Sequence, residues 1–483
     1  MRAENAMTEM RTAAQPDVGA TKGSRDGLYL AVIALALALD AGSVAIINAA
    51  LPRIGTDLGM RGPVLQLVVT AYAALFAAFL LCGGRAADRF GRRRLLIIGL
   101  STTAVGSVIC VAVSAVTALL VGRSLQGLGA ALAGPAALSL ITELFPDGPR
   151  RARALAVYTG VGAASFSGGL VLGGVMTESL DWRGVFWCTA AAAGAAAVAG
   201  RLILPAGGRD LTTGLDLIGS VGAAVALLLL VAGAAQISDP AGHSAYWGLL
   251  TFGSAIFVII WLVHHERNTP SPLLSAELVR SPAVRLAVLA ALVFYTALLS
   301  VLFFAPILLQ TYLHYSPLAS ALAIGPMGLI VILSANMAGR HIDRFGIRAT
   351  LATGMTLLGL GVLCWALFNA SATYLSLILP AVVVMSLGQG IAFVALTAAS
   401  LTDVEERFHG VAGAVNITAQ QVGGSVGVAL LVLLATAVGS DTPNAAVSVN
   451  GSRWAFVAAA ALCIAVAVTT MLGHRSLRQN HNN

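Results

Sequence analysis

Two charged residues stand inside long apolar runs, and both could handle protons. Asp40 follows the stretch LYLAVIALALAL in the first apolar run. At 1.5 Å per helical residue, it would lie about 18 Å from the start of that run. Burying an aspartate there costs about 2.5–3.5 kcal/mol, so the side chain should face a bundle interior or a water-filled cavity. Loss of water favours a protonated carboxyl group, which makes Asp40 a candidate proton-coupling site. The alternative is a structural hydrogen bond to a neighbouring hydroxyl.

Arg123 is the second deep charge and lies in the fourth apolar run. If successive runs cross in alternating directions, Arg123 lies about 10 Å and Asp40 about 12 Å below the same surface of a ~30 Å apolar layer. These depths allow contact between the two side chains, directly or through water. Arg123 is therefore the second proton-coupling candidate. The alternative is an arginine whose head group reaches back to the surface.

A charged motif occurs twice, with matching residues 255 positions apart: GGRAADRFGRRRLL begins at Gly83 and AGRHIDRFGIRAT begins at Ala338. Glycines permit tight turns, and aspartates can pair with arginines or with helix N-terminal amides. We expect both copies to act as a gate at one end of the molecule. The alternative is charge that only sets orientation. The gate candidates are Gly84, Arg85, Asp88, Arg89, Gly91 and Arg92 in the first copy, and Gly339, Arg340, Asp343 and Arg344 in the second.

Polar and small residues on the apolar runs form two further groups of candidates. Amide and phenol side chains could line a substrate cavity or could bond neighbouring helices. They are Asn48, Gln66, Tyr72, Gln126, Asn336, Gln389, Asn416 and Gln420. Glycines and one proline could serve as hinges or as positions of close helix packing. They are Pro135, Gly168, Gly169, Gly173, Gly174, Gly423 and Gly427.

The amino-acid composition indicates that most of the chain lies in an apolar environment rather than in water. Only 10% of the 483 residues are charged and 58% are hydrophobic, whereas soluble proteins contain about 25% charged residues. A membrane-spanning helix needs about 20 apolar residues. Fourteen stretches qualify: 28–50, 64–83, 95–114, 116–141, 153–177, 184–204, 216–236, 246–264, 286–310, 317–338, 349–368, 373–400, 409–437 and 453–473. The expected fold class is an all-α integral membrane protein embedded in the lipid bilayer.

The arginines and lysines predict the orientation. Twenty-three of the 28 fall in the two tails and in the loops after even-numbered spans, four fall on the other side and one lies inside a span. Because basic residues accumulate on the cytoplasmic side, both termini and both motif copies are expected in the cytoplasm. The same distribution accounts for the net charge of +7 without a nucleic-acid partner.

The repeat predicts two six-helix halves with an insert between them. Parallel repeats with a substrate site at mid-depth are a known transporter design. The expected domains are a tail (1–27), the first half (28–204), a linker region with two extra helices (205–285, helices at about 216–236 and 246–264), the second half (286–473) and a tail (474–483). Both tails are expected to be cytoplasmic, and the protein is expected to be a monomer.

Other chemistry finds no support in the sequence. The five cysteines are scattered singly, and their spacing fits neither a metal site nor a disulfide framework. The patterns HExxH and GxSxG and the phosphate-binding loop are absent. The sequence therefore predicts no metal, no cofactor, no enzymatic activity and no self-contained ATP-driven pump.

The chain resembles the major facilitator superfamily and, within it, the fourteen-span drug:proton antiporters. The resemblance rests on both motif copies and on the segments RSLQGLGAALAGPAAL (from Arg123), NAALPRIGTDLG (from Asn48) and NITAQQVGGSVGVALL (from Asn416). It implies alternating access, proton-driven export of small lipophilic drugs or antibiotics across the plasma membrane (the inner membrane of a bacterial cell), and a role for Arg123 in proton transfer. An uptake symporter or facilitator on the same fold is the alternative, and a membrane sensor or intramembrane enzyme is a further one.

The chain departs from this family at two places. Ser43 occupies the position where the family usually has an aspartate in the first span, and Asp40 lies one helical turn earlier. In the fifth span, GLVLGG places Leu170 where the family's motif has a proline. The first departure bears on the proton-coupling role, and the second bears on antiport as opposed to another form of coupling.

Overall fold

The computed structural model describes residues 18–479, apart from residues 61, 113, 146–147, 206–215, 238–244, 270–280, 370, 403–408 and 440–447. Within these residues every regular element is a helix. The elements of the first part are α2 (Val18–Leu58), α3 (Gly62–Phe90), α4 (Arg92–Ala112), α5 (Val116–Leu144), α6 (Pro149–Ser179), α7 (Asp181–Ile203), α8 (Leu217–Ile237) and α9 (Ala245–Asn268). The second part contains α11 (Pro282–Tyr312), α12 (Pro317–Ile324), α13 (Pro326–Trp365), η1 (Tyr374–Ile378), α14 (Leu379–Leu401), α15 (His409–Val422), η3 (Gly423–Gly427), α16 (Val428–Val438) and α17 (Val449–Gln479).

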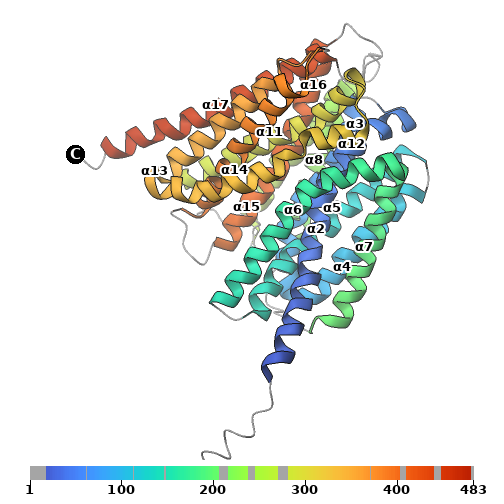
Figure 1. Cartoon of the computed structure of the whole chain (residues 1–483), viewed down its shortest axis with the longest axis vertical. Helices are drawn as coiled ribbons and strands as arrows, with labels where there is room; N and C mark the ends of the chain where they lie inside the picture. The colour runs from blue at the N-terminus through green and yellow to red at the C-terminus, as the bar shows by residue number, and fades with distance from the viewer. Residues whose placement is uncertain are drawn as a thin grey trace, which may run out of the picture.

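The helices pack in two groups, α2 to α7 and α11 to α17. Figure 1 shows α2 to α7, coloured blue to green, packed together, and α11 to α17, coloured yellow to red, packed together. The four most extensive helix pairs lie within these groups: α13 with α14, α4 with α5, α2 with α6 and α3 with α5. Helices α8 and α9 pack on each other, and α8 also packs on α3. Helix α8 also contacts η3 and α16 of the second group, although its packing on α3 is more extensive.

The number of membrane-spanning helices differs from the fourteen predicted. By length and apolar composition, eleven helices in the described part of the chain can cross a membrane, and the bent helix α3 raises the number to twelve. The segment Pro317–Trp365 is counted once although it contains two predicted spans. Helix α8 contains only a shorter apolar segment, Leu217–Leu230. The difference thus arises where helices run on into each other or where an apolar segment is short.

Several helices extend beyond the predicted spans. Helix α2 already begins at Val18, inside the predicted tail 1–27, and ends at Leu58 instead of residue 50. Helix α17 continues to Gln479. The apolar length of a span limits only the part in lipid, and helical hydrogen bonding continues into the polar flanks. Residues 1–17 and most of the loops 205–215 and 265–285 lie outside the described residues.

Local sequence signals explain where two helices of the second group begin. Helix α11 follows Ser281 and starts with Pro282, and helix α12 follows Ser316 and starts with Pro317. In each case the serine side chain accepts a hydrogen bond from a backbone N–H of the first turn. Proline at the first helical position has no N–H to leave unbonded. The serine–proline pair is therefore a strong start signal.

The two ends of the helix groups are named here by their contents. The motif end contains Gly91 and Gly346, one from each copy of the repeated motif. The distal end contains the last residues of α2, α6 and α11, namely Leu58, Ser179 and Tyr312. Three hydrogen bonds between the two groups lie at the distal end: Gln310 Nε2 to Ala49 O, Ser316 Oγ to Glu178 Oε2 and Leu318 N to Glu178 Oε2.

Candidate functional site

Arg123 is completely enclosed in the first helix group. Its side chain is 1% exposed, and helix α5 directs it toward α2 and α3. Arg123 Nε donates to Val68 O at 3.0 Å, and Nη1 donates to Ser43 Oγ at 2.9 Å and to Gln126 Oε1 at 2.7 Å. Its Nη2 is buried and has no hydrogen-bond partner among the described residues. The acceptors of the Arg123 guanidinium are thus a backbone carbonyl, a hydroxyl and an amide oxygen rather than a carboxylate. This arrangement is costly, because a buried charge is stable only when it is paired.

Tyr72 separates the two deep charges. The guanidinium carbon of Arg123 lies 4.6 Å from the centre of the Tyr72 ring, a cation–π geometry. The Tyr72 hydroxyl donates a hydrogen bond to Asp40 Oδ1. The predicted contact between Asp40 and Arg123 is therefore indirect, and the intermediary is a phenol. Tyr72, which was only a candidate for cavity lining, lies at the centre of the network.

Asp40 is the least buried of the three residues Asp40, Tyr72 and Arg123. Its side chain is partly exposed, whereas Tyr72 and Arg123 are each 1% exposed. Tyr158 of α6 and Tyr295 of α11 lie within electrostatic range of the carboxyl group. Because α11 belongs to the second helix group, Asp40 lies near the boundary between the groups.

The network continues on the other side of Arg123. Gln126 Nε2 donates to Ser107 Oγ at 2.6 Å, and Ser107 Oγ donates to Thr103 O at 2.7 Å. Gln126 is thus an interhelical bridge between α5 and α4. The sequence analysis did not select Ser107, and a lone serine in an apolar run carries no signal that would have singled it out.

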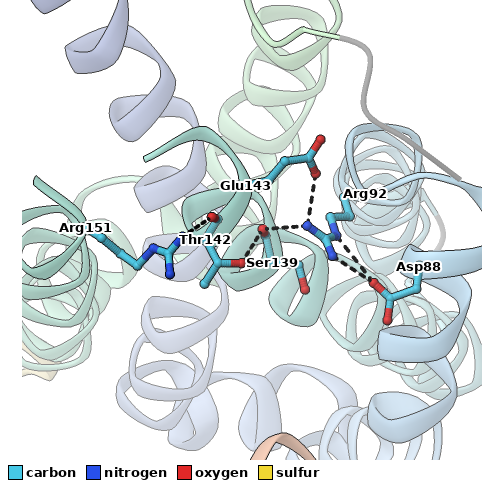
Figure 2. A network of polar contacts seen from close by, with 6 residues as sticks. All are labelled: Asp88, Arg92, Ser139, Thr142, Glu143 and Arg151. Carbon is cyan, nitrogen blue, oxygen red and sulfur yellow. Dashed lines mark hydrogen bonds and ion pairs between the residues drawn. The ribbon is translucent and has the colours of Figure 1, made fainter. Parts of the chain in front are cut away.

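The first copy of the motif forms an ion network at the motif end. Asp88 Oδ1 accepts from Arg92 at 3.3 Å, and Arg92 Nη1 donates to Glu143 Oε2 at 3.1 Å and to Ser139 O at 3.3 Å. Figure 2 shows Arg92 between Asp88 of α3 and the end of α5. An arginine at the last carbonyls of a helix is favourably placed for the helix dipole. The described bonds of Asp88 and Arg92 stay inside the first helix group.

Another arginine completes this end of the first group. Arg151 Nη2 donates to Thr142 O at 2.7 Å and Nε donates to Phe145 O at 3.1 Å, both at the C-terminal end of α5 (Figure 2). The sequence analysis did not select Glu143. Its spacing from Arg92 contains no signal, because the contact is made between α4 and α5.

The second copy has the same backbone turn but a different environment. Gly91 and Gly346 both have positive φ, +99° and +83°. Asp343 is exposed and has no hydrogen bond or ion pair with the described residues, and Arg340 and Arg344 are also exposed. A Cβ added to Gly339 would meet nothing within 4 Å. The structure therefore places the second set of gate candidates together at the surface without an ion network around Asp343.

The glycine candidates separate into packed and open positions. A Cβ on Gly169 would lie 3.1 Å from Gly42 Cα, and one on Gly173 would lie 2.8 Å from Ile46 Cα, so α6 lies directly against α2. The glycines of η3 face α11: a Cβ on Gly423 would lie 2.7 Å from Leu292 Cα, and one on Gly427 would lie 2.7 Å from Thr296 Cγ2. Gly168, in contrast, faces open space.

Two other candidates are local features of the first group. Pro135 lies inside α5 without ending it, and a Cβ on Gly84 would lie 3.7 Å from Pro135 Cβ. The motif helix α3 therefore passes close to the proline position of α5.

The remaining polar candidates have different roles. Asn48 Nδ2 bonds Val44 O and Asn336 Nδ2 bonds Ile332 O within their own helices, and Asn336 is exposed. Gln66 Nε2 donates to Thr70 Oγ1, also within its own helix.

Three of the amides offer buried acceptors. The acceptor oxygens Gln66 Oε1, Gln389 Oε1 and Asn416 Oδ1 are buried with no hydrogen-bond partner among the described residues. Gln420 is 5% exposed. Unsatisfied buried acceptors are costly, so these three oxygens are suited to bind water or a polar group of a substrate.

A metal site is not formed by the part of the chain that the structure describes, which contains no cluster of three or more His, Cys, Asp or Glu side chains suited to hold an ion. The five cysteines are free thiols.

Comparisons with known proteins agree with this architecture. The family model of the Major Facilitator Superfamily matches residues 33–428. The puromycin resistance protein of Streptomyces alboniger is 34% identical over 440 residues, covering 88% of this chain and 86% of that protein. The cephamycin export protein of Amycolatopsis lactamdurans is 32% identical over 432 residues, covering 88% of each chain.

Solved structures show the same fold. A crystal structure of a peptide transporter in complex with sulfate has a TM-score of 0.69 at 16% identity, covering 92% of this chain and 94% of that one. A bacterial homologue of the human lysosomal transporter Spinster also has a TM-score of 0.69, at 16% identity, with 92% and 96% covered. The resemblance drawn from the sequence motifs is confirmed: the chain is a multi-pass membrane protein that belongs to the major facilitator superfamily.

Proposed function

We propose that this protein exports small lipophilic compounds of the antibiotic type by alternating access, driven by the proton gradient. The observation that carries the proposal is the network in which Tyr72 joins the partly exposed Asp40 to the buried Arg123. The relatives support the direction of transport, since they are named for puromycin resistance, cephamycin export and tetracenomycin C resistance and export. These names favour export over uptake on the same fold.

The proposed coupling follows from the hydrogen bonds of Asp40. The ionised carboxylate accepts the Tyr72 hydroxyl, which holds the ring against Arg123. Protonation at Asp40 removes the negative charge and weakens this charge-assisted bond. Tyr72 can then turn away, and the surroundings of Arg123 change with it. Proton binding and release at the boundary between the helix groups thus bias the two conformations of the transporter.

The proposed substrate class follows from the other polar groups. The acceptor oxygens Gln389 Oε1 and Asn416 Oδ1 are buried without a partner among the described residues and offer hydrogen bonds. Binding sites that combine an apolar lining with a few polar groups accept compounds with a large apolar surface and a small number of donors. Puromycin, lincomycin and tetracenomycin C, which appear in the names of relatives, are suitable first compounds to test.

The proposed topology has fourteen spans with both termini in the cytoplasm of the cell membrane. Division of Pro317–Trp365 at Gly346, together with α8, adds two spans to the twelve that length and composition support. The motif end is then cytoplasmic and the distal end external. Cysteines introduced between residues 265 and 285 should react only with permeant reagents, and cysteines between 238 and 246 should react with impermeant ones. The reverse pattern would contradict this topology.

The coupling is tested with purified protein in liposomes that carry an imposed pH gradient. Asp40→Asn should abolish gradient-driven transport of the test compounds while leaving their equilibrium binding measurable, because Asn can still bond Tyr72 but cannot ionise. Tyr72→Phe should weaken coupling and retain binding. Ser43→Ala removes only one of three hydrogen bonds from Arg123 and should have a smaller effect. Normal transport by Asp40→Asn together with failure of Ser43→Ala would move the coupling site to Ser43.

A further inference from the structure

Glu178 lies in the last turn of α6, but its bonding partners belong to the second helix group. Glu178 Oε2 accepts a hydrogen bond from Ser316 Oγ at 2.8 Å and from Leu318 N at 3.2 Å. Ser316 is the N-cap residue of α12 and Leu318 lies in the first turn of that helix. A single carboxylate oxygen therefore joins the two groups at the distal end.

The first turn of α12 depends on this carboxylate for one of its backbone donors. Pro317 has no N–H, Ala319 N donates to Ser316 Oγ at 3.1 Å and Ser320 N donates to Ser316 O at 2.9 Å. The remaining first-turn donor, Leu318 N, is bonded by Glu178. Because the first N–H groups of a helix have no partner inside the helix, separation of the two groups would leave Leu318 N to water.

The charge of Glu178 is badly placed for its own helix and well placed for the other one. The C-terminal end of a helix carries a partial negative charge, which repels a carboxylate in the last turn of α6. The N-terminal end of α12 carries a partial positive charge and attracts it. The electrostatic advantage of Glu178 therefore exists only while the two helices are together.

The backbones of the two helices are close enough to make the contact specific. Gly174 lies four residues before Glu178 and thus on the same face of α6. A Cβ on Gly174 would lie 2.8 Å from Ala321 Cβ and 2.9 Å from both Leu318 Cα and Pro317 O. Any side chain at position 174 would push the groups apart.

We infer that Glu178 is the latch that holds the distal end closed, by capping α12 from the opposite helix group. This inference rests on the proposed alternating access, in which the distal end must open in turn. At the motif end of the same structure, the described bonds of Asp88 stay within the first group. The bonds of Glu178, in contrast, cross between the groups and are lost when the distal end opens.

The experiment measures the distance between spin labels at positions 180 and 322, whose native leucines are exposed. The labels are placed on cysteines in full-length protein in lipid nanodiscs, with the five native cysteines replaced by alanine. Glu178→Gln removes the charge but keeps the size of the side chain. The ratio of long-distance to short-distance populations should rise about fivefold or more, because a charge-assisted bond contributes only to the closed state. Gly174→Ala should shift the populations in the same direction through steric contact.

Two matched variants serve as controls. Asp181→Asn removes a carboxylate at the same end, but Asp181 pairs with Arg183 of its own group, and Asn tolerates the positive φ of 64° at this position. Gly168→Ala adds a methyl group to α6 where the structure leaves open space. Both variants should keep the distance distribution of the unmodified protein.

The outcomes separate the latch from the proposed function. An unchanged distribution in Glu178→Gln would overturn the latch, and so would a shift of equal size in Asp181→Asn. The distance measurement needs neither substrate nor proton gradient. If Glu178→Gln opens the distal end but the unmodified protein transports none of the test compounds, the latch stands and the proposed export fails.

Discussion

The two copies of the repeated motif have the same backbone conformation at the glycine but differ in their charged side chains. Gly91 and Gly346 both adopt positive φ. The guanidinium before each phenylalanine lies over its ring, with Arg89 at 5.8 Å from Phe90 and Arg344 at 5.1 Å from Phe345. Both phenylalanines are exposed. The two copies therefore build the same helix-breaking turn.

The two copies differ in their ion pairs because a different residue follows the glycine in each copy. Arg92 follows Gly91 and connects Asp88 to Glu143, whereas Ile347 follows Gly346 and cannot form an ion pair. Asp343 has no such partner among the described residues. The turn depends on a glycine that both copies have, and the ion network depends on an arginine that only one has. The first copy should therefore control transport more strongly than the second.

The largest expected difference between the copies concerns their aspartates. Asp88→Asn should slow transport by up to about fivefold, because the exposed pair that Asp88 forms with Arg92 contributes at most about 1 kcal/mol. Asp343→Asn should change the rate less than about twofold, because Asp343 makes no bond that the structure describes. Initial rates in liposomes, normalised to inserted protein, measure both. Equal losses in the two variants would remove the functional asymmetry.

The glycines should behave alike in the two copies. Alanine at Gly91 or Gly346 must adopt a positive φ, which costs about 1–2 kcal/mol per residue for an L-residue. Each variant should lower thermal stability by a similar amount, measured by unfolding in detergent, with Gly168→Ala as a control at a helical glycine in open space. Loss of stability in only one of the two variants would show that the turns are not equivalent.

Smaller effects are expected for the ion pairs of the first copy. The side chains of Arg92, Asp88 and Glu143 are 31%, 45% and 30% exposed, so solvent screens their interactions. Exposed pairs contribute about 0.2–1 kcal/mol. A double-mutant cycle with Arg92→Met and Glu143→Gln should give a coupling energy in this range that decreases at high salt. A coupling energy independent of salt would indicate a hydrogen bond rather than an ion pair.

The smallest expected effect is a gain in stability when an ion pair is introduced into the second copy. Ile347→Arg places an arginine four residues after Asp343, the spacing of Asp88 and Arg92. An exposed pair of this spacing should stabilise the helix end by about 0.3–0.5 kcal/mol. The transport rate should become slightly more sensitive to Asp343→Asn in this background. An unchanged response would mean that Glu143, which has no counterpart there, is the necessary partner.

The sequence predicted the fold better than it predicted the contacts within the site. Apolar length and the repeated motif were sufficient to predict an all-α membrane protein of the major facilitator superfamily. They were not sufficient for the contact between Asp40 and Arg123, because depth along a helix leaves its rotation undetermined. Tyr72 occupies the position between the charges, and only the packing of α2, α3 and α5 brings these three residues together.

By itself, the sequence determined that the chain is a helical membrane protein, because stretches of about twenty apolar residues are not stable in water. It also determined the turn in each copy of the motif, because an L-residue other than glycine seldom adopts a positive φ. It also located Asp40 and Arg123 as the deep charges, because an ionisable group is conspicuous in an apolar run. The tertiary structure alone decided which residues meet: Ser43 with Arg123, Arg92 with Glu143, and Glu178 with the start of α12. These contacts join helices that are distant in the chain, and the relative rotation and separation of packed helices depend on all the side chains between them.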